Sequence, residues 1–414
     1  MPLTLVFSGC GAKTDLSVPD VSDSYTPVSV IDRDAGLDDN GALSEECVEL
    51  GFDQPEFVDI SFEARISSAD ILFLVDVTGS MSEEITQIRT TLSETLIPAM
   101  VRSVPDLRLA VAGFADFGIS PYGARDDTPF ELLQPMTESL SEVRDAVFSL
   151  RESSGGDGPE SQVEALYQVA TGEGRGRFVP PADCPEETFG APCFRSMGSP
   201  IVLLFTDAEF HNGPGASRPY LEGDIEPPPA TYGETVNALR EVGAKVLGLY
   251  SGSEGANRGV LDLNAIARDT GAVDLGGAPV VFQIGTRGEE LDSGVIDVVR
   301  RLVEDVDLDI DAIALDDPSD EFDASDFVDR IVTLQAKPES GAVQFETSFA
   351  QVVPGTRVSF RVFLDNDLVA PTEEPQRYLL DIALRGDGVT ILDTVTVAIV
   401  IPSSRKEGCS TLGP

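Results

Sequence analysis

The stretch Ile71-Leu72-Phe73-Leu74-Val75-Asp76-Val77-Thr78-Gly79-Ser80-Met81-Ser82-Glu83-Glu84 decides the fold of this chain. Its five leading apolar residues predict a strand that is buried on both faces. The strand ends in a carboxylate at Asp76 and is followed by hydroxyls at Thr78 and Ser80, where open α/β sheets bind their ligands. Oxygen donors of this kind suit Mg²⁺, Ca²⁺ or Mn²⁺ better than zinc. The alternative is an ordinary strand-to-helix turn, since Ser80 and Glu83 also fit a helix capping box.

Two later segments add acids in a similar setting. The glycine-rich stretch Gly155-Gly156-Asp157-Gly158-Pro159-Glu160 places two carboxylates just before a helical pattern. The apolar strand Ile201–Phe205 is followed by Thr206-Asp207-Ala208-Glu209-Phe210-His211, so a second strand delivers an acid at its end.

These three segments resemble the von Willebrand factor A family, and most closely the A-like domain of integrin β subunits. In that group the first motif is D-x-S-x-S-M followed by two acids, the second is D-x-P-E, and the third is T-D-A-x-x-H. Here they read Asp76-Val77-Thr78-Gly79-Ser80-Met81 with Glu83 and Glu84, Asp157-Gly158-Pro159-Glu160, and Thr206-Asp207-Ala208 with His211. The order of the motifs and the kinds of element that carry them also agree.

The resemblance implies a metal-ion-dependent adhesion site that binds Mg²⁺, or Mn²⁺ or Ca²⁺ in its place. Its ligands would be Asp76, Thr78, Ser80, Glu160 and Asp207. Thr78 replaces the serine of the family but keeps the hydroxyl group.

Three further acids are candidates for additional metal binding. Glu83 and Glu84 stand where the integrin group has two aspartates of an adjacent Ca²⁺ site, although they also suit the first turn of a helix. Asp157 and Pro159 match residues of a third cation site, whose other ligands the sequence does not place. The alternative for Asp157 is a turn residue beside glycine.

Charge and composition exclude several classes of function. The 414 residues carry a formal net charge of −44, and 42% of them are hydrophobic, which permits a folded core. Such an acidic chain is not expected to bind nucleic acid, which needs Lys and Arg against phosphate, or to adsorb to anionic lipid. An acid-rich, lysine-poor surface is typical of a salty or extracellular setting.

The N-terminal sequence predicts export. The apolar run from Leu3 to Cys10 resembles a bacterial lipoprotein signal, in which the cysteine is lipidated, although no Lys or Arg precedes it. Residues 1–9 are therefore interpreted as a signal-peptide remnant and residues 10–46 as a flexible tether. The expected location is the bacterial cell envelope, at the outer membrane or cell surface, with membrane contact only through lipid at Cys10.

The remaining cysteines are even in number, which suits disulfide bonds. Cys184 and Cys193 are close together in one Pro-rich loop, whereas Cys47 and Cys409 lie at opposite ends of the folded region. Pairing the latter two would close a very long loop. The alternative is four buried thiols in a reducing cytosol.

The order of patterns predicts two structural parts. Residues 68–304 alternate strands and helices, which indicates a Rossmann-like A domain with a mostly parallel sheet and helices on both faces. Its Gly/Pro-rich interruptions, 172–199 and 208–231, are the expected binding loops. Residues 305–409 contain short alternating strands typical of an all-β sandwich. In integrin β subunits the A-like domain is inserted in a sandwich, so the resemblance implies that residues 47–67 supply a strand to this sandwich.

The expected function is therefore that of a surface-anchored binding or adhesion protein whose metal engages a carboxylate of a protein partner. In the resembled family the last helix, here about 289–303, can shift and couple the site to its neighbour. We do not expect an enzyme, because His211 is the only histidine and no P-loop or Rossmann glycine pattern follows a strand. The alternatives are a scaffold lipoprotein with an inactive metal site and a metal-assisted hydrolase.

Overall fold

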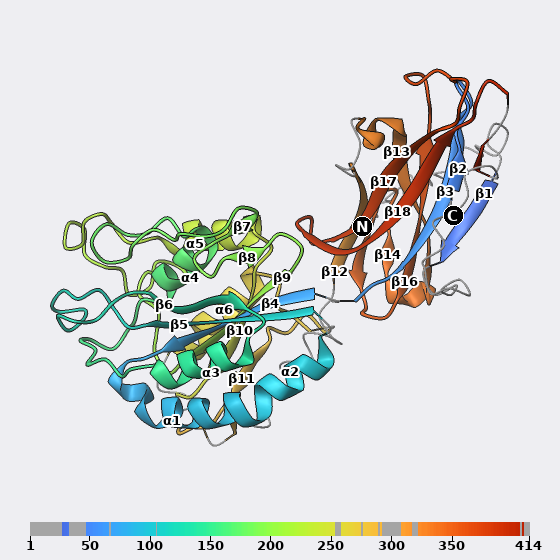
Figure 1. The fold of residues 1–414 in the computed structure, drawn as a ribbon. Coiled ribbons are helices and arrows are strands. Elements are labelled where there is room, and N and C mark those ends of the chain that lie inside the picture. The colour runs from blue at the N-terminus through green and yellow to red at the C-terminus, as the bar shows by residue number, and fades with distance from the viewer. Residues whose placement is uncertain are drawn as a thin grey trace, which may run out of the picture.

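The computed structural model describes residues 27–32, 47–65, 68–104, 106–252, 258–274, 276–288, 290–291, 308–316, 322–405 and 408–409. These residues form an α/β part and a β-sandwich part, which lie beside each other in Figure 1. The expected signal remnant and Cys10 lie outside the described residues, as does nearly all of the helix expected at 289–303.

The α/β part is built on one six-stranded sheet. Its strands, in spatial order, are β11 (Val281–Gln283), β10 (Lys245–Tyr250), β9 (Ser199–Thr206), β4 (Ser68–Asp76), β5 (Asp106–Phe114) and β6 (Glu131–Thr137). All neighbours are parallel except β6, which pairs with β5 in the antiparallel sense. The apolar strand that opened the sequence analysis is therefore central, as its continuous run of buried residues requires.

Helices cover both faces of this sheet, as Figure 1 shows. Their bounds are α1 (Ser82–Thr91), α2 (Ile97–Ser103), α3 (Leu140–Ser149), α4 (Gln162–Thr171), α5 (Tyr232–Glu241) and α6 (Gly259–Asp269). Alternate residues of β4 point to opposite faces. Phe73 and Val75 pack in the same cluster as α1 and α3, whereas Leu72 and Leu74 pack in the cluster that contains α4 and α5. The fold class is thus the expected α/β arrangement.

The sandwich part consists of two sheets with the strand orders β1-β3-β16-β13 and β14-β15-β12-β17-β18-β2. Their bounds are β1 (Pro27–Asp32), β2 (Cys47–Glu49), β3 (Glu56–Glu63), β12 (Leu308–Asp316), β13 (Val328–Lys337), β14 (Val343–Gln344), β15 (Ser348–Val352), β16 (Arg357–Leu364), β17 (Gln376–Gly386) and β18 (Thr390–Ile401). Strand β3 is antiparallel to β16 along its whole length, and β2 is parallel to β18. Segments from before and after the α/β part therefore share the same sheets.

Several elements differ from the sequence-based expectation. The range expected to be a tether contains β1, which runs parallel to β3. The edge strand β6 was not predicted, because Pro135 interrupts it and its sequence shows no alternation of apolar and polar residues. Most of its residues are partly exposed in the structure. The short strands β14 and β15 pair with each other as a hairpin. A π-helical turn at Leu92–Leu96 joins α1 to α2, so the helical segment runs without a break to Ser103.

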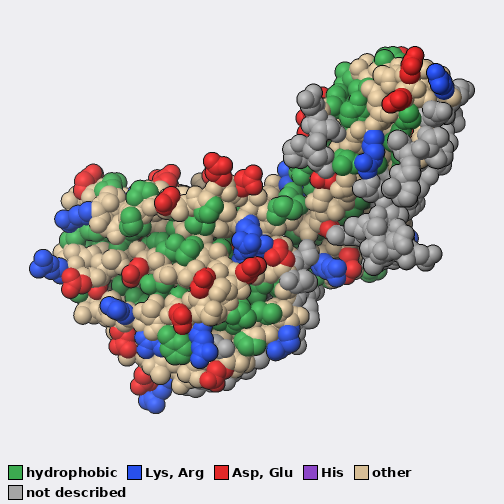
Figure 2. Space-filling model, viewed as in Figure 1, with side chains coloured by type: hydrophobic (Ala, Val, Ile, Leu, Met, Phe, Trp, Pro, Cys, Tyr) green, Lys and Arg blue, Asp and Glu red, His purple; other side chains and the backbone are tan. Residues whose placement is uncertain are grey.

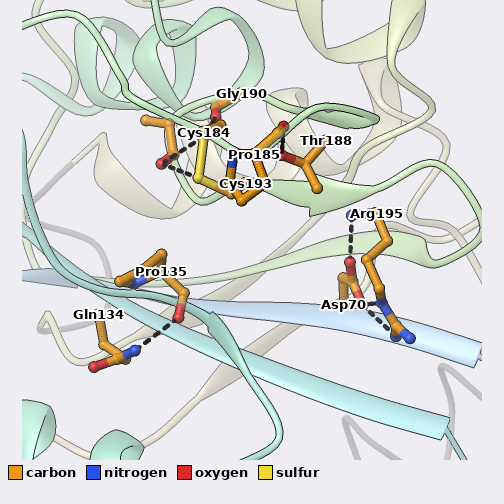
Figure 3. Close-up of a disulfide and its surroundings, with 10 residues drawn as sticks. Asp70, Gln134, Pro135, Cys184, Pro185, Thr188, Gly190, Cys193 and Arg195 are labelled. Atoms are coloured by element: carbon orange, nitrogen blue, oxygen red, sulfur yellow. Dashed lines mark hydrogen bonds and ion pairs between the residues drawn. A yellow bond between two sulfur atoms is a disulfide. The ribbon is translucent and has the colours of Figure 1, made fainter.

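Both expected disulfides are present. Cys47 is bonded to Cys409, with a Cα–Cα distance of 5.9 Å, and ties β2 to the end of the described chain. Cys184 is bonded to Cys193, with a Cα–Cα distance of 5.4 Å, and closes the loop shown in Figure 3. The alternative of four thiols in a reducing compartment does not agree with these pairings.

The two parts also meet through side chains at the amino-terminal end of β10. Lys245 Nζ lies 2.8 Å from Asp387 Oδ2 in the turn between β17 and β18. Lys245 is only 9% exposed, whereas Asp387 is exposed, so this ion pair lies at the protein surface with its lysine side covered. The contact lies at the opposite end of the parallel strands from their carboxyl termini, and it leaves that other edge of the sheet open.

We predict that Phe62→Ala destabilises the sandwich although Phe62 precedes the α/β part in the sequence. Phe62 is buried and contacts Phe360 edge to face, with ring centroids 6.5 Å apart. Removing a buried aromatic ring costs about 3–5 kcal/mol in the free energy of unfolding. In calorimetry, Mg²⁺ is expected to raise the unfolding temperature of the α/β part, which identifies that transition. The other transition, that of the sandwich, should occur at a lower temperature in Phe62→Ala.

The matched control is Phe345→Ala, because Phe345 is 55% exposed and should contribute little. A variant Phe62→Ala that lowers only the Mg²⁺-sensitive transition would show that β3 stabilises the α/β part instead.

Candidate metal centre

The residues expected to bind a metal meet at the carboxyl edge of the α/β sheet. Asp76 ends β4 and Asp207 follows β9. The hydroxyl of Ser80 donates a hydrogen bond to Asp207 Oδ1 at 3.0 Å, and the hydroxyl of Thr78 donates to Asp76 Oδ1 at 2.6 Å. The two hydroxyl oxygens are 3.2 Å apart, so all four side chains form one connected group. We call these residues together with Glu160 the primary site.

An open pocket of about 330 Å³ lies over the primary site. Its lining includes Thr78, Ser80, Glu160 and Asp207, together with the glycine-rich loop before α4. Asp76 is fully buried and is reached from this pocket only through the residues around it. The opening gives a ligand from outside access to the hydroxyl and carboxylate oxygens.

The structure decides against the capping-box interpretation of Ser80. Helix α1 begins at Ser82 after a short 3-10 turn at Gly79–Met81, and its N-cap residue is Met81, without a side-chain cap. The Ser80 hydroxyl is directed to Asp207 instead. The hydroxyl therefore belongs to the site and not to the helix terminus.

Backbone pairing brings Glu160 to the same place. Glu160 N donates to Glu209 O at 2.9 Å, and His211 N donates to Glu160 O at 2.8 Å, so the glycine-rich loop is fastened to the segment after β9. Gly156 is required in that loop because a Cβ at its position would lie 2.1 Å from the carbonyl oxygen of Tyr122. The Glu160 carboxylate is buried, and its Oε2 has no hydrogen-bond partner among the described residues. A buried carboxylate oxygen of this kind is costly unless a cation satisfies it.

Two supporting residues were not identified from the sequence. The Thr206 hydroxyl donates to Asp76 Oδ2 at 2.7 Å and accepts a hydrogen bond from Gln162 Nε2 at 2.9 Å. These two hydrogen bonds fix the orientation of the Asp76 carboxylate from its buried side. The threonine of the T-D-A motif was the available signal for Thr206, whereas nothing local to Gln162 indicated its role.

Electrostatics at the primary site favour a bound cation. Burial raises the pKa of Asp76 to about 7, and the negative charge of Asp207 adds to this effect. Burial and then the charge of Asp76 raise the pKa of Glu160 to about 11, and burial also raises the pKa of Asp207. The acids repel one another in the absence of a counter-charge, and a divalent ion would reverse that repulsion. The oxygen-only donor set and the unpartnered Glu160 oxygen therefore fit a hard divalent ion such as Mg²⁺.

The acids proposed for an adjacent metal have separate partners. Glu83 Oε2 lies 3.0 Å from Arg287 Nε, and both side chains are well exposed. Glu84 is buried, its carboxylate interacts with the Ser251 hydroxyl, and burial raises its pKa. The guanidinium of Arg287 thus provides the positive charge next to Glu83.

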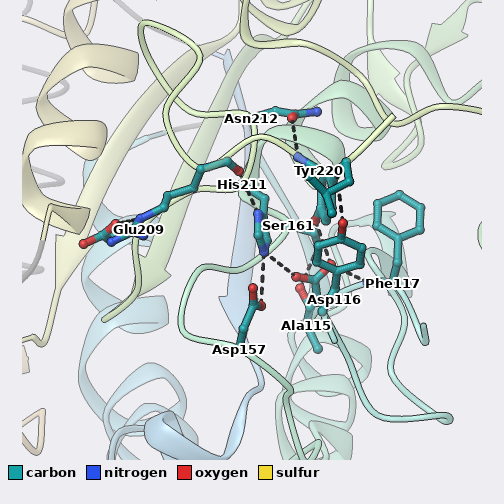
Figure 4. A network of polar contacts seen from close by, with 12 residues as sticks. Ala115, Asp116, Phe117, Asp157, Ser161, Glu209, His211, Asn212 and Tyr220 are labelled. Carbon is teal, nitrogen blue, oxygen red and sulfur yellow. Dashed lines mark hydrogen bonds and ion pairs between the residues drawn. The ribbon is translucent and has the colours of Figure 1, made fainter. Parts of the chain in front are cut away.

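Asp157 belongs to a different group, which Figure 4 shows. Its Oδ1 lies 3.2 Å from His211 Nε2, and Asp116 Oδ2 lies 3.4 Å from the same nitrogen. The three ligand atoms all lie within 4.8 Å of one another. We call Asp116, Asp157 and His211 the histidine cluster. Asp116 was missed from the sequence, although it lies only two residues after the end of β5.

Only one of the two expected binding loops lies at this edge. The first, 172–199, is closed by the Cys184–Cys193 disulfide, and its end lies at the start of β4, where Arg195 N donates to Asp70 Oδ2. None of its residues lines the pocket, so this loop does not flank the site as expected. From the second, 208–231, Tyr220 and Ile225 pack with Phe117 and Tyr122 in a small apolar cluster of their own. In Figure 2 acidic side chains are spread over the visible face of the α/β part and do not gather in one patch. Only the second loop thus lies beside the pocket, where Ala208 is part of the lining.

Comparisons with known proteins give structural neighbours only. No protein-family model matches the chain, and no curated protein matches it. A von Willebrand factor type A protein from Catenulispora acidiphila overlaps with a TM-score of 0.37 and 9% identity, covering 87% of this chain and 72% of that one. The pilus adhesin SpaC from Lactobacillus rhamnosus GG, in its open conformation, overlaps with a TM-score of 0.34 and 11% identity, covering 82% of this chain and 44% of the adhesin. This chain thus spans less than half of the adhesin.

Overlaps this low carry no argument about function. The fold class rests on the sheet order and on the helices on both faces, which agree with the Rossmann-like von Willebrand factor A arrangement. Among the described residues, no helix is long and apolar enough to cross a membrane.

We predict that Asp207→Asn abolishes Mg²⁺ binding and leaves the protein folded. The change removes a charge that faces Asp76 and keeps the size of the side chain. Isothermal titration should show at least a 100-fold loss of Mg²⁺ affinity, about 2.7 kcal/mol or more, while the metal-free variant should be as stable as the parent or more stable. Asp145→Asn, at an exposed position of α3, is the control. Unchanged Mg²⁺ affinity in Asp207→Asn would remove Asp207 from the site.

A second prediction concerns pH. Because the pKa of Asp76 is raised from 3.8 to about 7, the metal-free folded state binds a proton that the unfolded chain releases. The metal-free protein should therefore lose stability as pH rises from about 4 to about 7. Mg²⁺ must displace this proton, so its affinity should rise between about pH 5.5 and about pH 8. Titrations in two buffers of different ionisation enthalpy would measure the released protons, and an affinity that does not change over this range would contradict the prediction.

Proposed function

We propose that this protein is a divalent-metal-dependent binding protein that engages an acidic group of a protein partner. The observation that carries the proposal is the buried Glu160 oxygen without a hydrogen-bond partner, next to the connected group of Asp76, Thr78, Ser80 and Asp207 under an open pocket. These five residues would hold Mg²⁺, or Mn²⁺ or Ca²⁺. When bound, the ion would supply an electrophilic position that an outside carboxylate can complete.

The residues of the chain prepare this position in three ways. Two hydroxyls, of Thr78 and Ser80, supply oxygen without adding charge, which leaves more of the positive charge of a bound ion for a partner. Thr206 holds Asp76 in one orientation from the buried side. Gly158 lies in the pocket wall with nothing within 4 Å of the place of a Cβ, so the approach over the loop is unobstructed.

Partner selection would belong to the loop 208–231, whose first residue, Ala208, lines the pocket. This loop is held through Tyr220, whose hydroxyl donates to Asp116 Oδ1 at 2.7 Å. Rigid loops reduce the entropy that is lost on binding, so they favour recognition of a defined surface.

The two disulfides favour an oxidising, extracytoplasmic location. Lipid attachment at Cys10 and an outer-membrane or cell-surface position extend this proposal from the N-terminal sequence. The net charge of −44 argues against nucleic acid as the partner.

A binding role is favoured over catalysis by the environment of the only histidine. His211 Nδ1 contacts the Arg218 carbonyl oxygen, and Nε2 faces the carboxylates of Asp116 and Asp157. Neither nitrogen is directed at a serine or cysteine, so the arrangement of a nucleophile and its base is not formed by His211 in the described structure. A scaffold without a working metal site is the remaining alternative.

A capture experiment tests the proposal. The full chain and Asp207→Asn are immobilised and exposed to cell-surface protein extract with Mg²⁺, and then eluted with chelator. We expect proteins that are retained by the parent only with Mg²⁺, released by chelator and competed by millimolar acetate, and absent from the Asp207→Asn column. Retention that is equal with chelator, or equal on both columns, would favour the scaffold alternative.

A further inference from the structure

A second pocket, of about 310 Å³, lies at the opposite end of the sheet from the primary site, where the α/β part meets the sandwich. Its basic lining comes from three elements: Arg240 from the last turn of α5, Lys245 from the start of β10 and Arg268 from the last turn of α6. The chain has 28 Lys and Arg against 72 Asp and Glu, so three cations in one pocket run against its composition. We call these three side chains the basic pocket.

Lys245 has donors to spare in this pocket. Its ammonium carries three N–H groups, and the carboxylate of Asp387 meets it at 2.8 Å. The ammonium has no further partner in the part of the chain that the structure describes. A Cβ at Gly271 would lie 3.7 Å from Nζ, so the absence of a side chain there keeps that side of the ammonium open. Two of the three donors are therefore available to a ligand.

The two arginines bring guanidinium groups to the same pocket. Arg240 Nε donates to the backbone oxygen of Asp269 at 2.6 Å, which fixes the guanidinium and leaves its terminal nitrogens for other contacts. The Arg268 side chain lines the pocket and has no partner among the described residues. A guanidinium is planar, and its fork of donors matches two oxygens of a phosphate or sulfate group.

The two acids in the lining have partners of their own. Asp387 Oδ1 accepts a hydrogen bond from the Asp309 backbone at 3.1 Å, and its Oδ2 is the oxygen that meets Lys245. Asp269 Oδ2 accepts a hydrogen bond from the Tyr232 hydroxyl at 2.8 Å. These contacts compensate part of the negative charge, so the two acids do not cancel the three cations.

Both helices that end at the pocket close their C-termini with glycine. Gly243 after α5 and Gly271 after α6 have φ values of +66° and +76°. Their backbone N–H groups donate to the carbonyl oxygens of Arg240 and Arg268. Carbonyl oxygens in the last turn of each helix are thereby occupied, which lowers the partial negative charge that a helix C-terminus would turn toward an anion.

The alternative is that each cation has a structural role only. An arginine in the last turn of a helix interacts favourably with the helix dipole, and Lys245 pairs with Asp387. That account explains each residue alone. It does not explain why all three line one pocket with donors to spare.

We propose that the basic pocket binds a doubly charged tetrahedral oxyanion, a phosphate or sulfate group, as the free ion or as a small monoester. Two guanidinium groups and an ammonium supply charge-assisted donors from three elements. A carboxylate carries half the charge and would be held more weakly. Lys245 would share its ammonium between Asp387 and the anion. The inference does not depend on the proposed binding function, because the basic pocket shares no residue with the primary site.

Titration calorimetry on the full chain, freed of metal and then of chelator, tests the proposal. Sulfate, phosphate, glycerol phosphate and acetate are titrated at about pH 8, where phosphate is doubly charged, with ionic strength held constant by chloride. We expect one sulfate or phosphate per chain, bound roughly 10-fold or more tightly than acetate. Glycerol phosphate that binds more tightly than phosphate would identify an ester as the ligand, and weaker binding would identify the free ion. Acetate bound as tightly as sulfate, or no saturation by about 20 mM sulfate, would overturn the proposal.

Arg268→Gln removes one cation that has no partner to lose, so this variant should keep the parent's unfolding temperature and bind sulfate about 5-fold or more weakly. Arg102→Gln is the matched control, because Arg102 is exposed and lies in the last turn of α2 but does not line the pocket. Asp207→Asn should bind sulfate as the parent does. Sulfate affinity that is unchanged in Arg268→Gln, or lowered equally in Arg102→Gln, would overturn the assignment.

Discussion

The parallel pairing of β4 with β9 is the constraint on which the rest of the structure depends. Their register places Val75 opposite Phe205, so that Asp76 and Asp207 leave adjacent strands at the same edge. Two acids so close together, with Glu160 beside them, repel one another and raise one another's cost of ionisation. Such an arrangement persists only because the surrounding structure determines it more strongly than the charges oppose it.

The aliphatic core supplies that opposing stability. Strand β4 is buried along almost its whole length, and its side chains alternate between two clusters that hold helices against both faces of the sheet. Hydrogen bonds from Thr78 and Thr206 then compensate part of the burial of Asp76. The carboxyl edge is therefore a set of mutually repelling acids on a rigid support, as the proposed metal site requires.

The sandwich is held from both ends of the chain. Strands β1, β2 and β3 come from before the α/β part, and the other strands of the sandwich come from after it. The Cys47–Cys409 disulfide joins the two ends covalently. The α/β part consequently leaves the sandwich and returns to it, and Lys245 with Asp387 adds an ion pair between the two parts. All of these contacts lie away from the carboxyl edge, so the pocket there remains open.

The sequence by itself determined the elements whose signals are local. Continuous apolar runs predicted the central strands, and acids directly after those strands predicted Asp76 and Asp207, because side-chain periodicity and the carboxyl edge of a parallel sheet follow from backbone geometry. Glu160 was assigned through the resemblance of its motif. The spacing and even number of the cysteines similarly indicated both disulfides. Tertiary structure alone decided that Thr206 holds Asp76, that Glu83 pairs with Arg287, and that Asp116 meets His211. These contacts join residues from different elements, and which atoms face each other is set by strand register and loop packing, neither of which leaves a periodic trace in the chain.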